Sequence, residues 1–259
     1  MLICDFVAGN NDRRTLKRCV LVCSQLASYC NTYLFARVKL SITQHRDAGF
    51  QRSFLKFARI IEKNRSIASC IKTLTLNFSS HYHQTSLPPF FAGSTNVTEL
   101  HLWVSKGLVD ERPTLLPDTT DAIFDSILSS GKLKKLYIGE FLMPSPAFFT
   151  RCSPSLTHLE LCRMDEHDGT ELLPSERGRP GPPIQLRHID AHPTTLARFA
   201  GAEREDGQPV FDFSRLRSVV TSFKGYEDSA WHLNALLRHE VPLETLDVSL
   251  RCKFASFLS

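Results

Sequence analysis

A short apolar pattern of the form L-x-x-L-x-L returns seven times along this chain of 259 residues and constrains the fold more than any other feature. The seven segments begin at residues 71, 97, 133, 156, 186, 216 and 243 and read IKTLTL, VTELHL, LKKLYI, LTHLEL, LRHIDA, LRSVVT and LETLDV. Because the last two apolar positions are two residues apart, both point to one face of a strand. A single strand cannot cover its own buried row, so such repeats are stable only when neighbouring strands stack.

The repeats predict an α/β fold over residues 43–259, a leucine-rich-repeat-like curved solenoid with about seven strands. Parallel strands line its concave face, and the returning segments lie outside as helices and loops. Helical spacing of apolar residues and candidate caps predict the helices 50–64, 118–131, 194–202 and 229–239. Segment 163–185 is rich in Pro and Gly and predicts a mobile loop. The fifth and sixth repeats carry Ala191 and Thr221 where bulk is expected, so we expect an imperfect solenoid there.

The first 42 residues follow a different pattern. Segment 12–27 predicts one helix that begins at a capping residue, and segment 33–42 alternates like a strand. One face of the predicted helix carries Leu16, Cys19, Val20, Cys23 and Ala27.

The motif T-L-x-x-C-x-L-V-C at Thr15 to Cys23, followed by Y-L-F-x-x-V-x-L at Tyr33 to Leu40, resembles the second half of the F-box motif. The chain is similar to the F-box and leucine-rich-repeat-like proteins of mushroom-type fungi. The resemblance implies a partial F-box-like segment at 1–42 that docks on a Skp-type adaptor within an SCF-type (cullin-RING) ubiquitin ligase, while the repeats hold a protein substrate. It further implies adaptor contacts at Leu16, Val20, Leu21 and Leu26.

The chain also departs from the F-box pattern. An F-box opens with a helix of the type L-P-x-E-I-x-x-x-I, and only Leu2 to Val7 stands where that helix should end. Gln25 and Leu26 replace the usual Trp. The start resembles a truncated gene product or a different start codon. Two functions therefore stay open: a substrate receptor, or a stand-alone repeat scaffold that no longer binds the adaptor.

Charge is unevenly distributed along the chain. Residues 1–72 hold 13 Lys and Arg against 4 Asp and Glu, whereas the whole chain holds 31 against 27. This basic head predicts a partner with an acidic surface, although a solvated helical surface needs no partner. No nucleic-acid-binding motif accompanies the charge, and no apolar run is long enough for a membrane span. We expect a cytoplasmic or nuclear protein whose eight scattered cysteines are mostly small buried hydrophobes.

Residues between the buried positions of each strand face the predicted concave wall. Large amphipathic side chains next to charges are typical of protein-recognition surfaces. We therefore expect a partner-binding patch at the positions His101, Trp103, Tyr137, Glu160 and Asp190. The alternative is a merely solvated wall.

The sequence predicts no catalytic residue, no cofactor and no metal ligand. Nucleotide-binding, zinc-protease and serine-hydrolase motifs are missing, which leaves only a distant alternative, a hydrolase assembled in three dimensions. Metal coordination is geometrically possible where neighbouring predicted strands carry His158, Glu160, His188, Asp190 and His192. An acidic face with scattered histidines is commoner than a metal site. Core packing is the better account of Cys19 and Cys23 than zinc.

Overall fold

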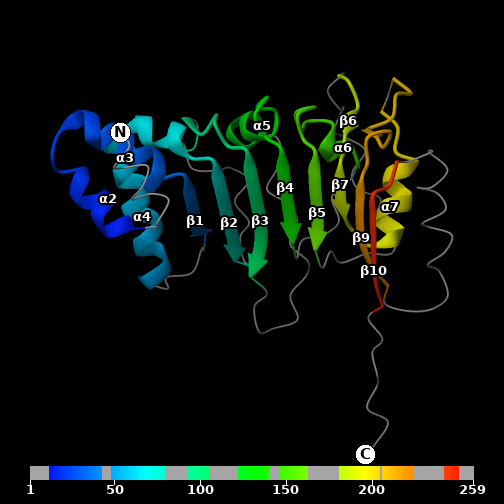
Figure 1. The fold of residues 1–259 in the computed structure, drawn as a ribbon, viewed down its shortest axis with the longest axis horizontal. Helices are drawn as coiled ribbons and strands as arrows, with labels where there is room; N and C mark the ends of the chain where they lie inside the picture. The colour runs from blue at the N-terminus through cyan, green and yellow to red at the C-terminus, as the bar shows by residue number, and fades with distance from the viewer. Residues whose placement is uncertain are drawn as a thin grey trace, which may run out of the picture. The chain divides into compact units, whose positions relative to one another are not determined.

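The computed structural model has an α/β fold and describes residues 12–42, 48–79, 91, 93–105, 122–139, 146–162, 181–204, 206–223 and 242–250. The chain divides into two compact units, Met1–Lys132 and Leu133–Ser259. The strands of each unit run parallel, as the arrows in Figure 1 show.

The first unit begins with two helices rather than one, so the prediction of a single helix over 12–27 is wrong. Helix α2 (Arg13–Cys19) begins after Asp12, whose carboxylate accepts hydrogen bonds from the backbone N–H groups of the first turn. A turn separates it from α3 (Ser24–Leu34), in which the Leu26 N–H donates a 3.5 Å hydrogen bond to the Cys23 sulfur. Cys23 is therefore an exposed N-cap residue and not part of the apolar stripe.

The two helices enclose a small core. Leu16 from α2 and Cys30 from α3 are its buried members. Partly buried side chains pack around them, namely Cys19, Val20, Leu26, Tyr29 and Leu34. A bond from the Arg13 guanidinium to the Leu34 carbonyl, 3.0 Å long, ties the start of α2 to the end of α3.

Strand β1 (Arg37–Ile42) follows α3 almost directly. It is shorter than the predicted strand 33–42, because Tyr33 and Leu34 still belong to the helix. It pairs with β2 (Thr73–Ser79), which pairs with β3 (Glu99–Ser105). The side chains of β2 alternate between buried and half-buried, as its repeat requires.

The returning segments of the first unit include two of the predicted helices. Helix α4 (Ala48–Lys63) confirms the helix expected over 50–64 and packs against β1, and η1 (Arg65–Cys70) leads into β2. Helix α5 (Ala122–Leu128) confirms part of the helix expected over 118–131, and it buries its last two apolar residues.

The second unit continues the same pattern with five parallel strands. They pair in the order β4 (Lys135–Gly139), β5 (His158–Cys162), β7 (His188–Asp190), β9 (Ser218–Phe223) and β10 (Thr245–Leu250). All seven repeats are thus confirmed as strands. Two further short strands, β6 (Ile184–Gln185) and β8 (Phe211–Asp212), pair with each other in a separate sheet. Of the segment predicted as a loop, 163–180 lies outside the described residues, and β6 occupies the end.

Helices and aromatic side chains complete the second unit. Helix α6 (Pro146–Phe149) is short, and α7 (Pro193–Ala200) confirms the helix expected over 194–202 and packs against β9. Their buried phenylalanines meet that of β8: the ring centroids of Phe149 and Phe199 lie 5.1 Å apart, and those of Phe199 and Phe211 lie 4.8 Å apart. The helix expected over 229–239 lies outside the described residues.

The fifth and sixth repeats are joined by a buried hydroxyl. Ala191 and Thr221 occupy the positions where bulk was expected, and both are buried. Strand β7 ends at Asp190, and the Thr221 hydroxyl donates a 2.8 Å hydrogen bond to the Ala191 carbonyl just beyond it. A polar contact therefore replaces an apolar one where the strand pairing stops.

Candidate recognition surface

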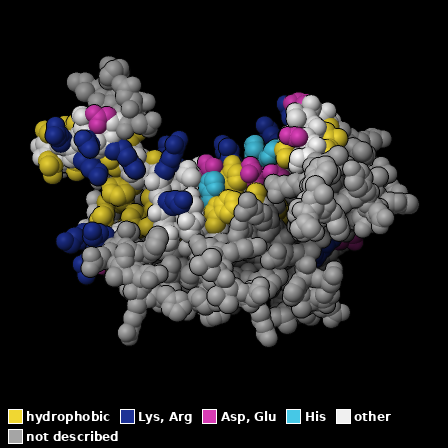
Figure 2. All heavy atoms as spheres, turned by 90° about the horizontal axis from the view of Figure 1, so that it is seen from below, with side chains coloured by type: hydrophobic (Ala, Val, Ile, Leu, Met, Phe, Trp, Pro, Cys, Tyr) yellow, Lys and Arg dark blue, Asp and Glu magenta, His cyan; other side chains and the backbone are white. Residues whose placement is uncertain are grey.

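Strands β2, β3, β4, β5, β7 and β9 bury one row of side chains and leave the alternate row largely half-exposed. Strand β10 differs, because Leu246 and Val248 of its apolar row are exposed. In β5 and β7 the buried and half-buried side chains alternate residue by residue. Figure 2 shows acidic and histidine side chains gathered on part of the exposed face. The positions predicted to face outward therefore do so.

In the first unit, the predicted residues His101 and Trp103 lie two apart on β3, and both are half-exposed. The His101 Nε2 atom lies 3.0 Å from the Glu99 carboxylate on the same strand. Glu99 also accepts a 3.4 Å hydrogen bond from the Thr73 hydroxyl of β2. These contacts fix the His101 imidazole against Glu99 and leave it half-exposed.

In the second unit, strand register brings the other three predicted residues together. Tyr137 of β4 pairs with Glu160 of β5, and Glu160 pairs with Asp190 of β7. Paired residues of adjacent strands are separated by about 5 Å. The three side chains therefore form one row across three strands, which we call the outward row (Tyr137, Glu160 and Asp190).

Two histidines flank the outward row on its N-terminal side. The rings of His158 and His188 lie 5.7 Å apart, and burial is the main cause that lowers the pKa of both. The His188 Nδ1 atom lies 3.0 Å from the Ser218 hydroxyl, and its Nε2 atom lies 3.8 Å from the Glu160 carboxylate. Lowered pKa values keep both rings predominantly neutral at pH 7.

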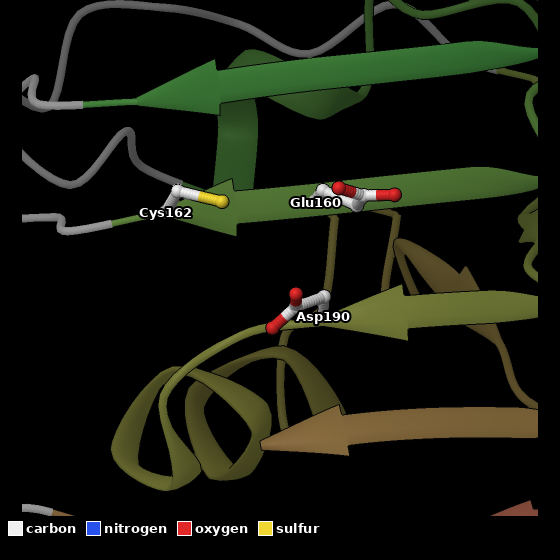
Figure 3. A group of neighbouring side chains, drawn as sticks. All are labelled: Glu160, Cys162 and Asp190. Atoms are coloured by element: carbon white, nitrogen blue, oxygen red, sulfur yellow. The ribbon is translucent and has the colours of Figure 1, made fainter. Parts of the chain in front are cut away.

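A thiol flanks the row on the other side, and the residues considered from the sequence as possible metal ligands did not include it. Cys162 lies two residues after Glu160 on β5, so it shares the outward face. Oxygen atoms of Glu160 and Asp190 and the Cys162 sulfur all lie within 4.8 Å of one another (Figure 3). Strand periodicity alone could have found this neighbour. His192, which was considered beside the acids, instead directs Nδ1 to the Thr194 hydroxyl at 2.9 Å.

The implied adaptor contacts divide into an inner and an outer group. Leu16 is only 2% exposed and belongs to the helix-pair core, and Val20 and Leu26 are half-buried against that core. Leu21 is 85% exposed, and its neighbour Val22, which sequence reasoning missed, is 71% exposed. Both lie in the turn between α2 and α3, which the continuous apolar pattern of the sequence does not indicate.

Helix α2, which leads into this turn, carries four exposed basic side chains. The exposed Lys and Arg residues of α2 are Arg13, Arg14, Lys17 and Arg18. Figure 2 shows dark blue basic side chains beside yellow apolar ones at this N-terminal end. We call this surface the helical turn patch: Leu21, Val22 and the four basic residues of α2.

Comparison with family models, curated proteins and solved structures gives no match for this chain. Among the helices that the structure describes, none has both the length and the apolar character to cross a membrane.

Proposed function

We propose that the chain is a non-enzymatic protein-recognition module that acts as the substrate receptor of an SCF-type ubiquitin ligase. In this proposal, the parallel strands belong to a leucine-rich-repeat-like solenoid whose concave wall holds a protein substrate. The N-terminal helices serve as a partial F-box that docks on a Skp-type adaptor.

The helical turn patch is the observation that carries the adaptor half of the proposal. Large apolar side chains exposed as fully as Leu21 and Val22 are costly in water, and burying one in an interface stabilises the complex by about 1.5–3 kcal/mol. The basic residues beside them favour a partner with an acidic surface, because opposite charges accelerate association. An apolar centre with a charged rim is the usual anatomy of a protein interface.

The outward face of the strands supports the substrate half. His101 and Trp103 in one unit, and the outward row in the other, place aromatic and charged side chains where they contact solvent. Aromatic residues dominate the binding energy of protein interfaces, and charges around them select the partner.

Binding of a purified Skp-type adaptor to the full-length chain tests the proposal. We expect a complex in size-exclusion chromatography and calorimetry, and we expect Leu21→Asp to weaken it more than about tenfold by placing a charge in the apolar centre. Leu55→Asp on α4 is the matched control, because Leu55 is also an exposed leucine of the first unit but lies outside the patch.

Absence of any complex between the adaptor and a folded chain would overturn the receptor proposal. That result would favour the stand-alone scaffold, which one structural observation supports. Leu16 faces inward, so the surface available to an adaptor is smaller than the motif implies. Equal weakening by Leu21→Asp and Leu55→Asp would show that binding does not use the helical turn patch.

A further inference from the structure

We propose that Glu160, Cys162 and Asp190 form a zinc-binding site on the outward face of β5 and β7. The three candidate ligand atoms are two carboxylate oxygens and one sulfur, and all three lie within 4.8 Å of one another (Figure 3). All three side chains are half-buried, so an ion can reach them from solvent. The site does not depend on adaptor binding, because its residues lie in the second unit.

The backbone explains why these residues meet. Glu160 and Cys162 are two apart on β5, which places both on one face, and Asp190 is the register partner of Glu160 on β7. Asp190 is also the last residue of β7. Two strands thus supply three ligands from a rigid, hydrogen-bonded scaffold, as a preorganised metal site requires.

The sequence predicts no metal site at these strands, because extended strands splay possible ligands and an acidic face with scattered histidines is commoner than a site. The histidines at 158, 188 and 192 make other contacts, to Thr157, Ser218 and Thr194 respectively. The structure replaces them with the thiol of Cys162, which changes the chemistry of the cluster. A thiolate ligand favours zinc over magnesium or calcium, which prefer oxygen ligands alone.

The distances fit zinc after small side-chain movements. Zinc is bound at about 2.0–2.2 Å by carboxylate oxygen and about 2.3 Å by thiolate, so tetrahedral ligands lie about 3.5 Å from one another. Contraction from separations of up to 4.8 Å needs at most about 1.3 Å per pair. Rotation of the Glu160 side chain shortens its two distances, and rotation of the Cys162 and Asp190 side chains shortens the third. Three protein ligands leave the fourth position to water.

Charge also favours a dication here. Two carboxylates within 4.8 Å repel each other, and a dication between them removes that repulsion. The Nε2 atom of His188 lies 3.8 Å from the Glu160 carboxylate, and its neutral ring adds no positive charge that would compete with the ion. On zinc binding the Cys162 thiol loses its proton to solvent and bonds the ion as thiolate.

The test is metal binding by the full-length protein after removal of metal with a chelator. In competition with a chromophoric chelator, we expect the wild-type protein to bind one zinc ion. The zinc affinity should fall at least about 100-fold in Cys162→Ser and in Asp190→Asn, because losing a ligand costs more affinity than losing a group that only contacts a ligand, which costs about 10–100-fold. Cobalt(II) in place of zinc should give a thiolate-to-cobalt charge-transfer band that Cys162→Ser abolishes.

Cys70→Ser is the matched control, because Cys70 is a half-buried free thiol of the first unit on η1. It should keep both the zinc affinity and the cobalt band. The proposal is overturned if the wild-type protein binds no zinc, if Cys162→Ser keeps the band, or if Cys70→Ser loses it. Should Cys162→Ser fail to fold, unchanged zinc affinity in Asp190→Asn and Glu160→Gln would overturn it equally.

Discussion

Replacement of Thr221 by valine tests whether the buried hydroxyl joins the fifth and sixth repeats. Thr221 is fully buried, and its hydroxyl donates a 2.8 Å hydrogen bond to the Ala191 carbonyl. Valine has nearly the same shape and keeps the branched side chain that strands favour. Thr221→Val therefore removes the hydrogen bond and little else.

The expected cost follows from two contributions. Leaving the Ala191 carbonyl without its donor in a buried place costs about 1–3 kcal/mol. The extra apolar methyl group returns about 0.8 kcal/mol. The net loss in the free energy of unfolding is the difference between the two, about 0.2–2 kcal/mol. Thr221→Ala, which also removes the buried methyl group, should lose about 2–3 kcal/mol.

Urea unfolding followed by circular dichroism measures this loss. With a slope of about 3 kcal/mol per M urea, Thr221→Val should lower the midpoint by about 0.1–0.7 M. Thr245→Val on β10 is the control, because Thr245 is exposed and its substitution should stay within about 0.5 kcal/mol. If Thr221→Val is as stable as the wild type while Thr221→Ala is not, the methyl group matters and the hydroxyl does not.

Two further predictions concern the second unit and the end of α5. Gly207 has φ 74°, so Gly207→Ala should cost about 1 kcal/mol in thermal or urea unfolding. Gly131→Ala should cost nothing, because a Cβ there meets no atom within 4 Å; equal losses would refute the backbone argument. Burial raises the pKa of Asp212, but hydrogen bonds from Ser214 and Gln185 and the Arg215 charge outweigh it and lower the pKa below 3.8. The ionised Asp212 carboxylate should therefore stabilise the folded state above pH 3.8, and this contribution should disappear as the pH falls through the folded-state pKa. Asp212→Asn should make the free energy of unfolding depend less on pH on the acid side, and an unchanged pH dependence would contradict this.

The strands could be predicted from the sequence because their signal is local and repeated. A buried row two residues apart appears at 71, 97, 133, 156, 186, 216 and 243, and each segment became a parallel strand. The outward positions follow from the same alternation, which is why Tyr137, Glu160 and Asp190 could be placed on one face.

The error in the N-terminal segment arose because one sequence pattern is compatible with two backbone conformations, a continuous helix or two helices joined by a turn. Leu16, Cys19, Val20 and Cys23 fit one continuous apolar stripe, yet the chain turns between Cys19 and Ser24. Two short helices can bury Leu16 and Cys30 against each other, whereas one straight helix cannot fold back on itself. That gain is tertiary, so helical periodicity does not report it.

The candidate metal ligands were only partly predictable for a different reason. Glu160 and Asp190 were recognised as neighbours, because strand order and register follow from the repeat. Cys162 was counted among the scattered cysteines, which are usually buried hydrophobes. How near its sulfur comes to the two carboxylates depends on side-chain rotamers, which no sequence pattern records.

The small sheet of β6 and β8 changes how the neighbouring repeats can open. In a stack of parallel repeats each repeat contacts only its neighbours, so local opening of one strand need not disturb the next strand. Here the segment before β7 and the segment before β9 are also hydrogen-bonded to each other. The Ile184 N–H donates to the Val210 carbonyl at 3.0 Å, and the side-chain amide of Gln185 donates to the Asp212 carboxylate at 3.1 Å. Opening of either repeat therefore breaks two ladders at once, which makes this pair one cooperative unit of hydrogen exchange.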